Sequence, residues 1–434
     1  MHNNKKLTGK ERDFLPEEIF YSVTDKKSKI TDFNEVFVRI SGFQEAELLG
    51  SPHKIIRHPA MPRAVFSLMW ETIPLYKNFG GYVNNCAKNG DNYWVFAFVT
   101  PVHQSYFSVR LKPTSQLLQV VKDIYNEALH EELKHQDLME QIDAGKRVIL
   151  TRLEKLGYPS YDEFWEEALI LELESRLSNW DRARLLKVYN SDDFYIFSIE
   201  NVLKSYSYCI NTYKLVKNLK TIFGEVTNAC VSLKRLALNL SIRAKKLGDK
   251  GRTLDCLSGE VSRLTERISA STHEMQQSAD FLYKFTLSYL LPLSQILIVN
   301  EGVLRRQFEE KWFGKRMPEE TIKLTNHIKE RIVKISRQLI LSGLDQNLAK
   351  LDSLLRDILR FDKTLEFISV SGKAEASRLN DSDAFYALLN QVQDQAKKMK
   401  EVYQFLSDFY VTFSALFFLG KSTFTEEHSS QALT

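Results

Sequence analysis

The sequence predicts an α+β domain at the N-terminus followed by an all-α region. Up to about residue 110, short apolar runs alternate with turns, which is typical of an antiparallel sheet with flanking helices. After Pro113, apolar residues recur every three or four positions, as in SQLLQVVKDIYNEAL, the spacing of amphipathic helices. The spacing continues to about residue 420, so we predict a helical bundle or coiled coil built of antiparallel hairpins.

The strands can be assigned in chain order. IFYSVTD is a strand, and KITDFNEVFVRISG is a strand followed by a helix. GGYVNNCAKNGDNYWVFAFVTPVHQ contains two strands around an Asn89-Gly90-Asp91 hairpin, and YFSVRLK is the last strand. We therefore place the sheet domain at residues 18–112, after an N-terminal extension over residues 1–17.

The helical part divides at clusters of turn-forming residues. We expect a helical linker region over residues 113–194 and an antiparallel bundle over 195–420, with hairpin tips near 248–252 and 379–383, a further turn at 313–318 and a disordered tail over 421–434. Residues 281–300 and 402–420 have about the length of a membrane span. Both contain charged residues, such as Lys284 and Asp408, so we interpret them as buried bundle helices and expect no membrane span.

Composition narrows the functional classes. The 434 residues carry a formal net charge of +4 from 59 basic and 55 acidic side chains, so nucleic acid is not expected as a partner. The four cysteines lack CxxC spacing, which argues against a zinc site or a disulfide framework and fits a reducing cytoplasm. The start of the chain has no apolar stretch of a secretory signal, so we expect a soluble cytoplasmic protein.

The runs HKIIRHPAMPRAVFSLMW and KNGDNYWVFAFVTPV make the region of residues 18–112 resemble the PAS domain of bacterial aerotaxis receptors, which bind FAD. The resemblance implies a cofactor site formed by Asn34, Arg57, His58, Trp70, Asn85 and Tyr93. The residue types suit a flavin, because its flat ring needs a stacking aromatic and hydrogen-bond donors, and its diphosphate needs positive charge.

The sequence departs from this family at Ala60, where aerotaxis receptors usually have aspartate. Two alternatives follow: a PAS domain that holds FAD, and a cofactor-free PAS domain in which Trp70 is a core residue and the histidines are loop residues. Heme is not the expected cofactor, because a lone histidine is a weak ligand signal.

Residues 236–264, LALNLSIRAKKLGDKGRTLDCLSGEVSRL, resemble the hairpin tip of methyl-accepting chemotaxis receptors. In such a tip, glycines allow two helices to reverse direction, and exposed polar residues contact kinase and adaptor proteins. The corresponding signalling-tip residues here are Asn239, Arg243, Lys246, Gly248, Gly251, Arg252 and Glu260. Arg243 stands where the family has glutamate, so control of the kinase does not follow from the resemblance.

A weaker copy of the tip pattern, ISVSGKAEASRLNDSDAFYALLNQV, covers residues 368–392, so one chain could carry both hairpins of a four-helix bundle. The first functional hypothesis is a signal-transduction protein of the chemotaxis and aerotaxis receptor type, which senses redox state or oxygen through a PAS-bound flavin. The alternative is a cofactor-free scaffold that associates with chemoreceptor arrays. Chemotaxis kinases, adaptors, chemoreceptors and other copies of the chain are the expected partners; no enzyme motif is present.

Overall fold

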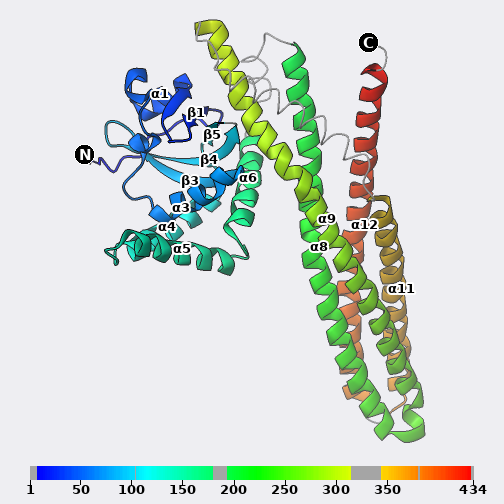
Figure 1. Cartoon of the computed structure of the whole chain (residues 1–434). Coiled ribbons are helices and arrows are strands. Elements are labelled where there is room, and N and C mark those ends of the chain that lie inside the picture. Colours follow the sequence, from blue (N-terminus) through cyan, green and yellow to red (C-terminus); the bar gives the residue numbers. More distant parts are fainter. Residues whose placement is uncertain (1–6, 103, 179–192, 314–343, 380–381, 432–434) are drawn as a thin grey trace. The chain divides into compact units, whose positions relative to one another are not determined.

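The structure is a computed structural model that describes residues 7–102, 104–178, 193–313, 344–379 and 382–431. Its N-terminal part contains a five-stranded antiparallel sheet in the order β2-β1-β5-β4-β3 (Figure 1). The strands are β1 (Ile19–Asp25), β2 (Ile30–Phe33), β3 (Phe79–Cys86), β4 (Asn92–Val102) and β5 (Ser105–Leu111). The sheet followed by long helices confirms the predicted fold class.

One face of the sheet, here called the inner face, packs against the short helices that connect β2 to β3. These are α1 (Glu35–Ser41), α2 (Glu45–Leu48), η1 (His53–Ile56), α3 (Arg63–Thr72) and η2 (Ile73–Leu75). Side chains alternate between the two faces of a strand. Phe20 of β1 and Tyr93 of β4 therefore point inward, where they share one apolar core with Phe37 of α1.

The outer face of the sheet is covered by α4 (Leu117–Glu132) and α6 (Tyr161–Ser178), while α5 (Leu138–Lys155) packs on α3 and α4. Ring centroids of Phe98 and Trp165 lie 6.2 Å apart, and those of Trp94 and Tyr125 lie 6.3 Å apart. Large aromatic side chains on the outer face of the sheet need cover from water. Helices α4 and α6, which belong to the predicted linker, provide this cover.

Two buried carboxylates attach these helices to the sheet domain. Glu172 of α6 accepts hydrogen bonds from the Tyr82 hydroxyl (2.7 Å), the Ser115 hydroxyl (2.5 Å) and the backbone N–H groups of Thr114 (2.7 Å) and Ser115 (3.1 Å). Glu132, the last residue of α4, accepts from the first two N–H groups of α3, Arg63 (2.8 Å) and Ala64 (2.9 Å). A carboxylate suits a helix N-terminus, where the N–H groups have no partner within the helix.

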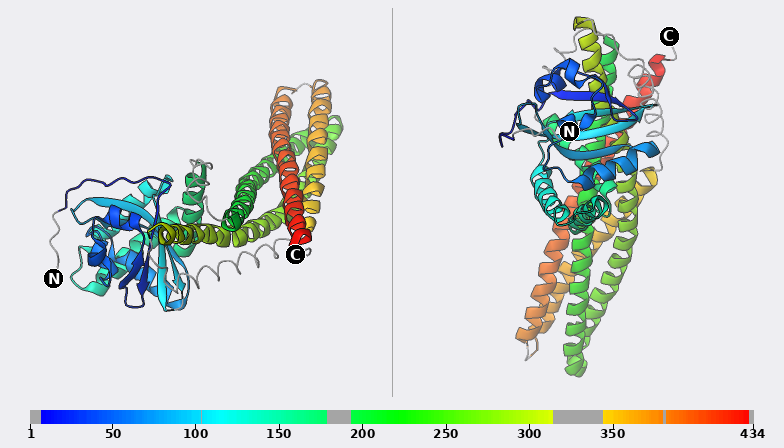
Figure 2. Two further views of the ribbon diagram at one scale, coloured as in Figure 1. Left: turned by 90° about the horizontal axis from the view of Figure 1, so that it is seen from above. Right: turned by 60° about the vertical axis from the view of Figure 1, so that its left-hand side comes forward.

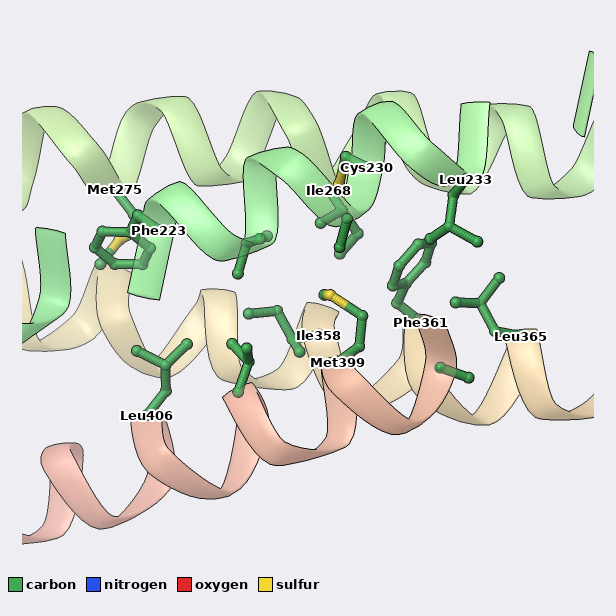
Figure 3. Packing of buried hydrophobic residues seen from close by; sticks show 14 of the residues in the cluster. Phe223, Cys230, Leu233, Ile268, Met275, Ile358, Phe361, Leu365, Met399 and Leu406 are labelled. Atoms are coloured by element: carbon green, nitrogen blue, oxygen red, sulfur yellow. The ribbon is translucent and has the colours of Figure 1, made fainter. Parts of the chain in front are cut away.

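The long helices are α8 (Asp193–Lys246), α9 (Arg252–Phe313), α11 (Leu344–Ala376) and α12 (Ser382–Gln431), and the short turn η3 (Gly248–Gly251) joins α8 to α9. α11 and α12 form the second hairpin (Figure 2). One apolar core takes Phe223 from α8, Ile268 from α9, Phe361 from α11 and Met399 from α12 (Figure 3). Both hairpins of a four-helix bundle thus come from a single chain.

The chain divides into two compact units, each formed by two segments of the sequence. One unit comprises Met1–Lys204 and Leu291–Lys334, and the other comprises Ser205–Leu290 and Ile335–Thr434. Helices α8 and α9 therefore each contribute to both units. In α9 the division falls beside Pro292, which lies inside the helix and cannot donate a backbone hydrogen bond there.

Three further expectations concern the long helices. α12 continues to Gln431 although a disordered tail was expected from residue 421, since no proline or glycine after Gly420 interrupts the helix. The turn expected at 313–318 falls, apart from the last residue of α9, outside the described residues. None of the helices in the described ranges is long and apolar enough to cross a bilayer, including those that contain 281–300 and 402–420.

Candidate functional site

The segment from Arg57 to Met61 lies along β3, the edge strand of the sheet. Arg57 forms an isolated β-bridge with Asn85, and its guanidinium donates to the Met61 carbonyl over 3.4 Å. The Asn84 N–H in turn donates to the Met61 sulfur over 3.2 Å. The structure therefore brings together Arg57 and Asn85, which are 28 positions apart and were both assigned to the cofactor site from sequence.

The Arg57 guanidinium packs 3.8 Å from the ring centroid of Phe66 on α3, as in a cation–π contact. Burial lowers the pKa of Arg57 to about 10, and the positive charge of Arg63 acts in the same direction. Arg57 therefore remains charged at neutral pH, and its side chain is held by α3.

His58 and Ala60 form a turn at the edge of this segment. The Ala60 N–H donates to His58 Nδ1 over 3.1 Å, and loss of water around the ring lowers the pKa of His58. Ala60 itself is exposed. Ala60 therefore lies in an exposed turn and is not one of the buried residues of the inner face.

Asn34 serves the fold through all of its side-chain groups. Its Oδ1 accepts from the Tyr21 and Phe37 N–H groups, both at 3.3 Å, and its Nδ2 donates to the Ile19 carbonyl over 3.0 Å. The side chain thus caps α1 and ties it to β1. These contacts give it a structural role next to the inner face.

Trp70 lies at the end of α3 and is 39% exposed. Its ring meets Tyr106 of β5 edge-on, with centroids 5.9 Å apart, and the Lys26 ammonium lies 4.4 Å from the Tyr106 centroid. This exposure contradicts the alternative that Trp70 is an ordinary core residue. An aromatic face and a cation are available together at this border of the inner face.

Five inner-face residues form what we call the inner-face polar cluster: Ser22, His53, Asn85, Tyr93 and Arg110. Arg110 Nη2 donates to the Ser22 hydroxyl over 3.1 Å and to His53 Nε2 over 2.5 Å. Asn85 and Tyr93 are opposite each other on β3 and β4, so both project to the same face.

Three buried groups of this cluster have no hydrogen-bond partner among the described residues: Asn85 Nδ2, the Tyr93 hydroxyl and Arg110 Nη1. Buried polar groups nearly always have partners, and an unpaired one is costly. Burial raises the pKa of Tyr93 and lowers that of Arg110 to about 10, so Tyr93 keeps its proton and Arg110 its charge. All three groups are therefore donors, which suits a ligand with several acceptor atoms, such as the ring edge of a flavin.

Arg110, Ser22 and His53 were not assigned to the site from the sequence. A signal for Arg110 exists in the strand YFSVRLK, because alternation places the arginine on the same face as Tyr106 and Ser108. A charged residue at an inward position of a fully buried strand is unusual, and it could have been selected on that ground.

At the first bundle tip, the backbone geometry explains why positions 248 and 251 are glycines. Gly248 has a positive φ of 58°, and a Cβ on Gly251 would lie 2.0 Å from the Ala244 carbonyl oxygen. Of the remaining signalling-tip residues, four are exposed and one, Glu260, is partly buried and pairs with Arg263 at 2.6 Å. The exposed ones are Asn239, Arg243, Lys246 and Arg252.

The second tip lies beside the first. Leu240, Ala244 and Leu254 of the first hairpin share a small core with Ala376 and Phe385 of the second. The described part of this tip ends at Leu379 and resumes at Ser382, so Asn380, which aligns with a glycine of the receptor pattern, lies outside the described residues.

Comparison with known proteins identifies the class of the sheet domain. Residues 30–109 match the family described as "PAS fold", so the N-terminal region of the chain contains a PAS domain. Among solved structures, the chain is similar to the blue-light photoreceptor Aureochrome1 LOV, at 16% identity and a TM-score of 0.23 over 24% of this chain and 90% of that one. A LOV domain of a histidine kinase from Erythrobacter litoralis gives 11% identity and a TM-score of 0.21 over 24% of this chain and 100% of that one.

Two other relatives match the chain at higher sequence identity than these structures do. The chain is 35% identical over 130 residues to the aerotaxis receptor of Escherichia coli, which covers 29% of this chain and 26% of the receptor. It is 30% identical over 126 residues to a nitrogen fixation regulatory protein of Klebsiella pneumoniae, covering 28% of this chain and 24% of that protein. The matched part therefore spans about a quarter of each relative, and the helical bundle is not part of these findings.

Proposed function

We propose that the protein is a signal-transduction protein whose PAS domain binds FAD on the inner face of its sheet and reports redox state or oxygen to the helical bundle. The observation that carries the proposal is the set of three unpartnered donors on that face, Asn85 Nδ2, Tyr93 OH and Arg110 Nη1. The similarity of the PAS domain to the aerotaxis receptor supports the same conclusion.

The cofactor would supply reversible electron transfer, and the protein would supply its binding and orientation. Asn85 and Tyr93 would donate hydrogen bonds from adjacent strands. Trp70 offers an aromatic surface at the border of the site, and Lys26 beside Tyr106 offers positive charge for a diphosphate. Because Asn85 also pairs with Arg57, a change in its hydrogen bonding would be felt by the segment that precedes α3.

The part of α9 from Leu291 onward is anchored to the PAS unit, which gives a path for the signal. Arg176 of α6 makes a buried ion pair with Glu301 of α9 (2.7 Å) and donates to the carbonyls of Pro16 (2.9 Å) and Glu17 (3.0 Å), just before β1. Both partners are almost fully buried, with side-chain exposures of 2% and 6%.

Asn78, one residue before β3, adds a second anchor by donating to Gln295 over 3.0 Å. A change in the sheet can thus act on α9, and α9 continues past Pro292 into the bundle. Breaking a buried ion pair is costly, so this connection can transmit small displacements instead of absorbing them.

The bundle tips are the proposed contact surface for a partner. Arg243 and Lys246 are exposed beside the apolar side chains of Leu238 and Ile242, which are 61% and 48% exposed. A surface that combines exposed apolar and cationic groups favours an acidic protein partner. Kinase or adaptor proteins of the chemotaxis system, or other chemoreceptors, are the proposed partners. We infer a role in sensing and interaction without catalysis.

The test is the visible absorption spectrum of the purified full-length protein, before and after incubation with FAD and removal of the unbound cofactor. We expect the bands of protein-bound oxidised flavin. Asn85→Ala should weaken this binding, whereas Asn89→Ala, in the exposed hairpin, is the matched control and should leave it unchanged. A protein that stays colourless after incubation contradicts the proposal and favours the cofactor-free scaffold, and a Soret band would indicate heme instead.

A further inference from the structure

Arg110 is a buried cation without an anionic partner. It is 3% exposed, and in the described part of the chain no carboxylate lies within ion-pair distance of its guanidinium. Its polar partners are two neutral groups, the Ser22 hydroxyl and His53. Because arginine only donates hydrogen bonds, His53 Nε2 must accept, and the ring proton is then on Nδ1. His53 is therefore neutral and compensates none of the arginine's charge.

Aromatic rings surround the other sides of the guanidinium. Its carbon lies 5.4 Å from the ring centroid of Phe37 and 5.8 Å from that of Phe20. Such contacts compensate only part of the lost hydration of a buried cation, since cation–π attraction is weak compared with the desolvation of an ion. A positive charge in an apolar setting makes this position attractive to a negative group.

Two other buried groups of the inner-face polar cluster, Asn85 Nδ2 and the Tyr93 hydroxyl, are also hydrogen-bond donors without a partner among the described residues. Tyr93 and Arg110 both lie against Phe20, whose ring centroid is 6.2 Å from that of Tyr93 and 5.8 Å from the guanidinium carbon, and Asn85 is the cross-strand neighbour of Tyr93. Donors without partners thus come from three different strands, β3, β4 and β5, and face the same side. This arrangement selects for a ligand that presents several acceptor atoms and gains negative charge.

We propose that Arg110 makes the inner face selective for the electron-rich form of its ligand. This inference rests on the proposed function: for a flavin, the ligand group is the ring edge that carries carbonyl oxygens and an acceptor nitrogen and that becomes more negative on reduction. Arg110 holds the reduced flavin more tightly than the oxidised one and so sets the redox level at which the domain responds.

The experiment compares the dissociation constants of oxidised FAD and of FAD reduced by dithionite under anaerobic conditions, by calorimetry on the full-length protein. The variants are Arg110→Met, which removes the charge, and Arg110→Gln, which removes the charge but keeps a donor toward Ser22. Arg39→Met is the matched control, because the Arg39 side chain is 53% exposed on α1. Far-UV circular dichroism verifies that each variant folds, and Arg110→Gln decides if Arg110→Met does not fold.

We expect removal of the charge to weaken binding of reduced FAD at least about tenfold more than binding of oxidised FAD, because hydrogen bonds to charged groups are the strong ones. The Arg39 variant should match the wild type. Equal weakening of both forms would give Arg110 only a structural role and overturn this inference while the proposed function stands. A wild-type protein that binds neither form would overturn both.

Discussion

Loss of the Glu172 carboxylate should weaken the attachment of α6 to the sheet and lower the stability of the fold. Glu172 is 1% exposed and accepts four hydrogen bonds, two from hydroxyl groups and two from backbone N–H groups. The hydroxyls of Tyr82 and Ser115 can rotate to accept a hydrogen bond instead, but the N–H groups of Thr114 and Ser115 can only donate. The two backbone donors therefore decide the cost of a substitution.

Glu172→Gln keeps one acceptor oxygen for the backbone donors and loses the charge. We expect it to lower the free energy of unfolding by about 2 kcal/mol, the difference between charged and neutral hydrogen bonds summed over the contacts. Glu172→Ala leaves both N–H groups buried without a partner, so we expect a loss of about 4 kcal/mol. The exposed Glu154 of α5 provides the control: Glu154→Gln should change stability by less than about 0.5 kcal/mol.

Tryptophan fluorescence during urea unfolding is the suitable assay. All five tryptophans lie within Met1–Lys204 and Leu291–Lys334, so the signal reports on the unit that contains the PAS domain. The order expected is wild type and Glu154→Gln, then Glu172→Gln, then Glu172→Ala. A Glu172→Ala protein as stable as the control would refute the view that this carboxylate holds α6 on the sheet.

Three further outcomes are expected. Trp70→Ala should cost less than about 2 kcal/mol, below the cost for a core tryptophan because the ring is 39% exposed, yet it should weaken FAD binding, as melting and calorimetry together would show. Gly251→Ala should lower the melting temperature of the bundle because its Cβ would meet the Ala244 carbonyl, whereas Gly224→Ala, with open space around it, should not; equal melting would argue against the turn geometry. Burial and two neighbouring acids raise the pKa of Glu166 to about 7, so the folded state binds the Glu166 proton more tightly than the unfolded state does. The free energy of unfolding should therefore fall as pH rises from the ordinary pKa of 4.5 to about 7. Glu166→Gln should remove this pH dependence in urea titrations at several pH values, and an unchanged dependence of stability on pH would contradict the prediction.

The sheet could be predicted from sequence because its pattern is local. Alternating apolar residues mark β1, β4 and β5, and the Asn89-Gly90-Asp91 turn marks the β3–β4 hairpin. Helical periodicity likewise marks the long helices. The packing of α6 on the sheet could not be read in this way, since the Tyr82–Glu172 contact joins residues 90 positions apart and neither residue is unusual in its own segment.

The candidate site was predictable in part. Arg57 and Asn85 were chosen through the resemblance to aerotaxis receptors, and the structure pairs them. Asn34 was chosen by the same route, but its side chain caps α1 and forms hydrogen bonds with β1. Arg110 was missed because strand alternation marks it as an inward-facing charge but does not say which groups surround it. That no carboxylate of the described residues pairs with it follows only from the structure.

The central claim is that reduction of a flavin on the inner face of the PAS sheet reaches the bundle through α9. Hydrogen exchange followed by mass spectrometry, on the full-length protein with oxidised and with reduced FAD, tests it most directly. We predict a change of exchange in β3 and in α9 around Glu301, and we predict that Arg176→Met keeps the first change and loses the second. Identical exchange of α9 in the two redox states of a flavin-loaded wild-type protein would contradict the claim.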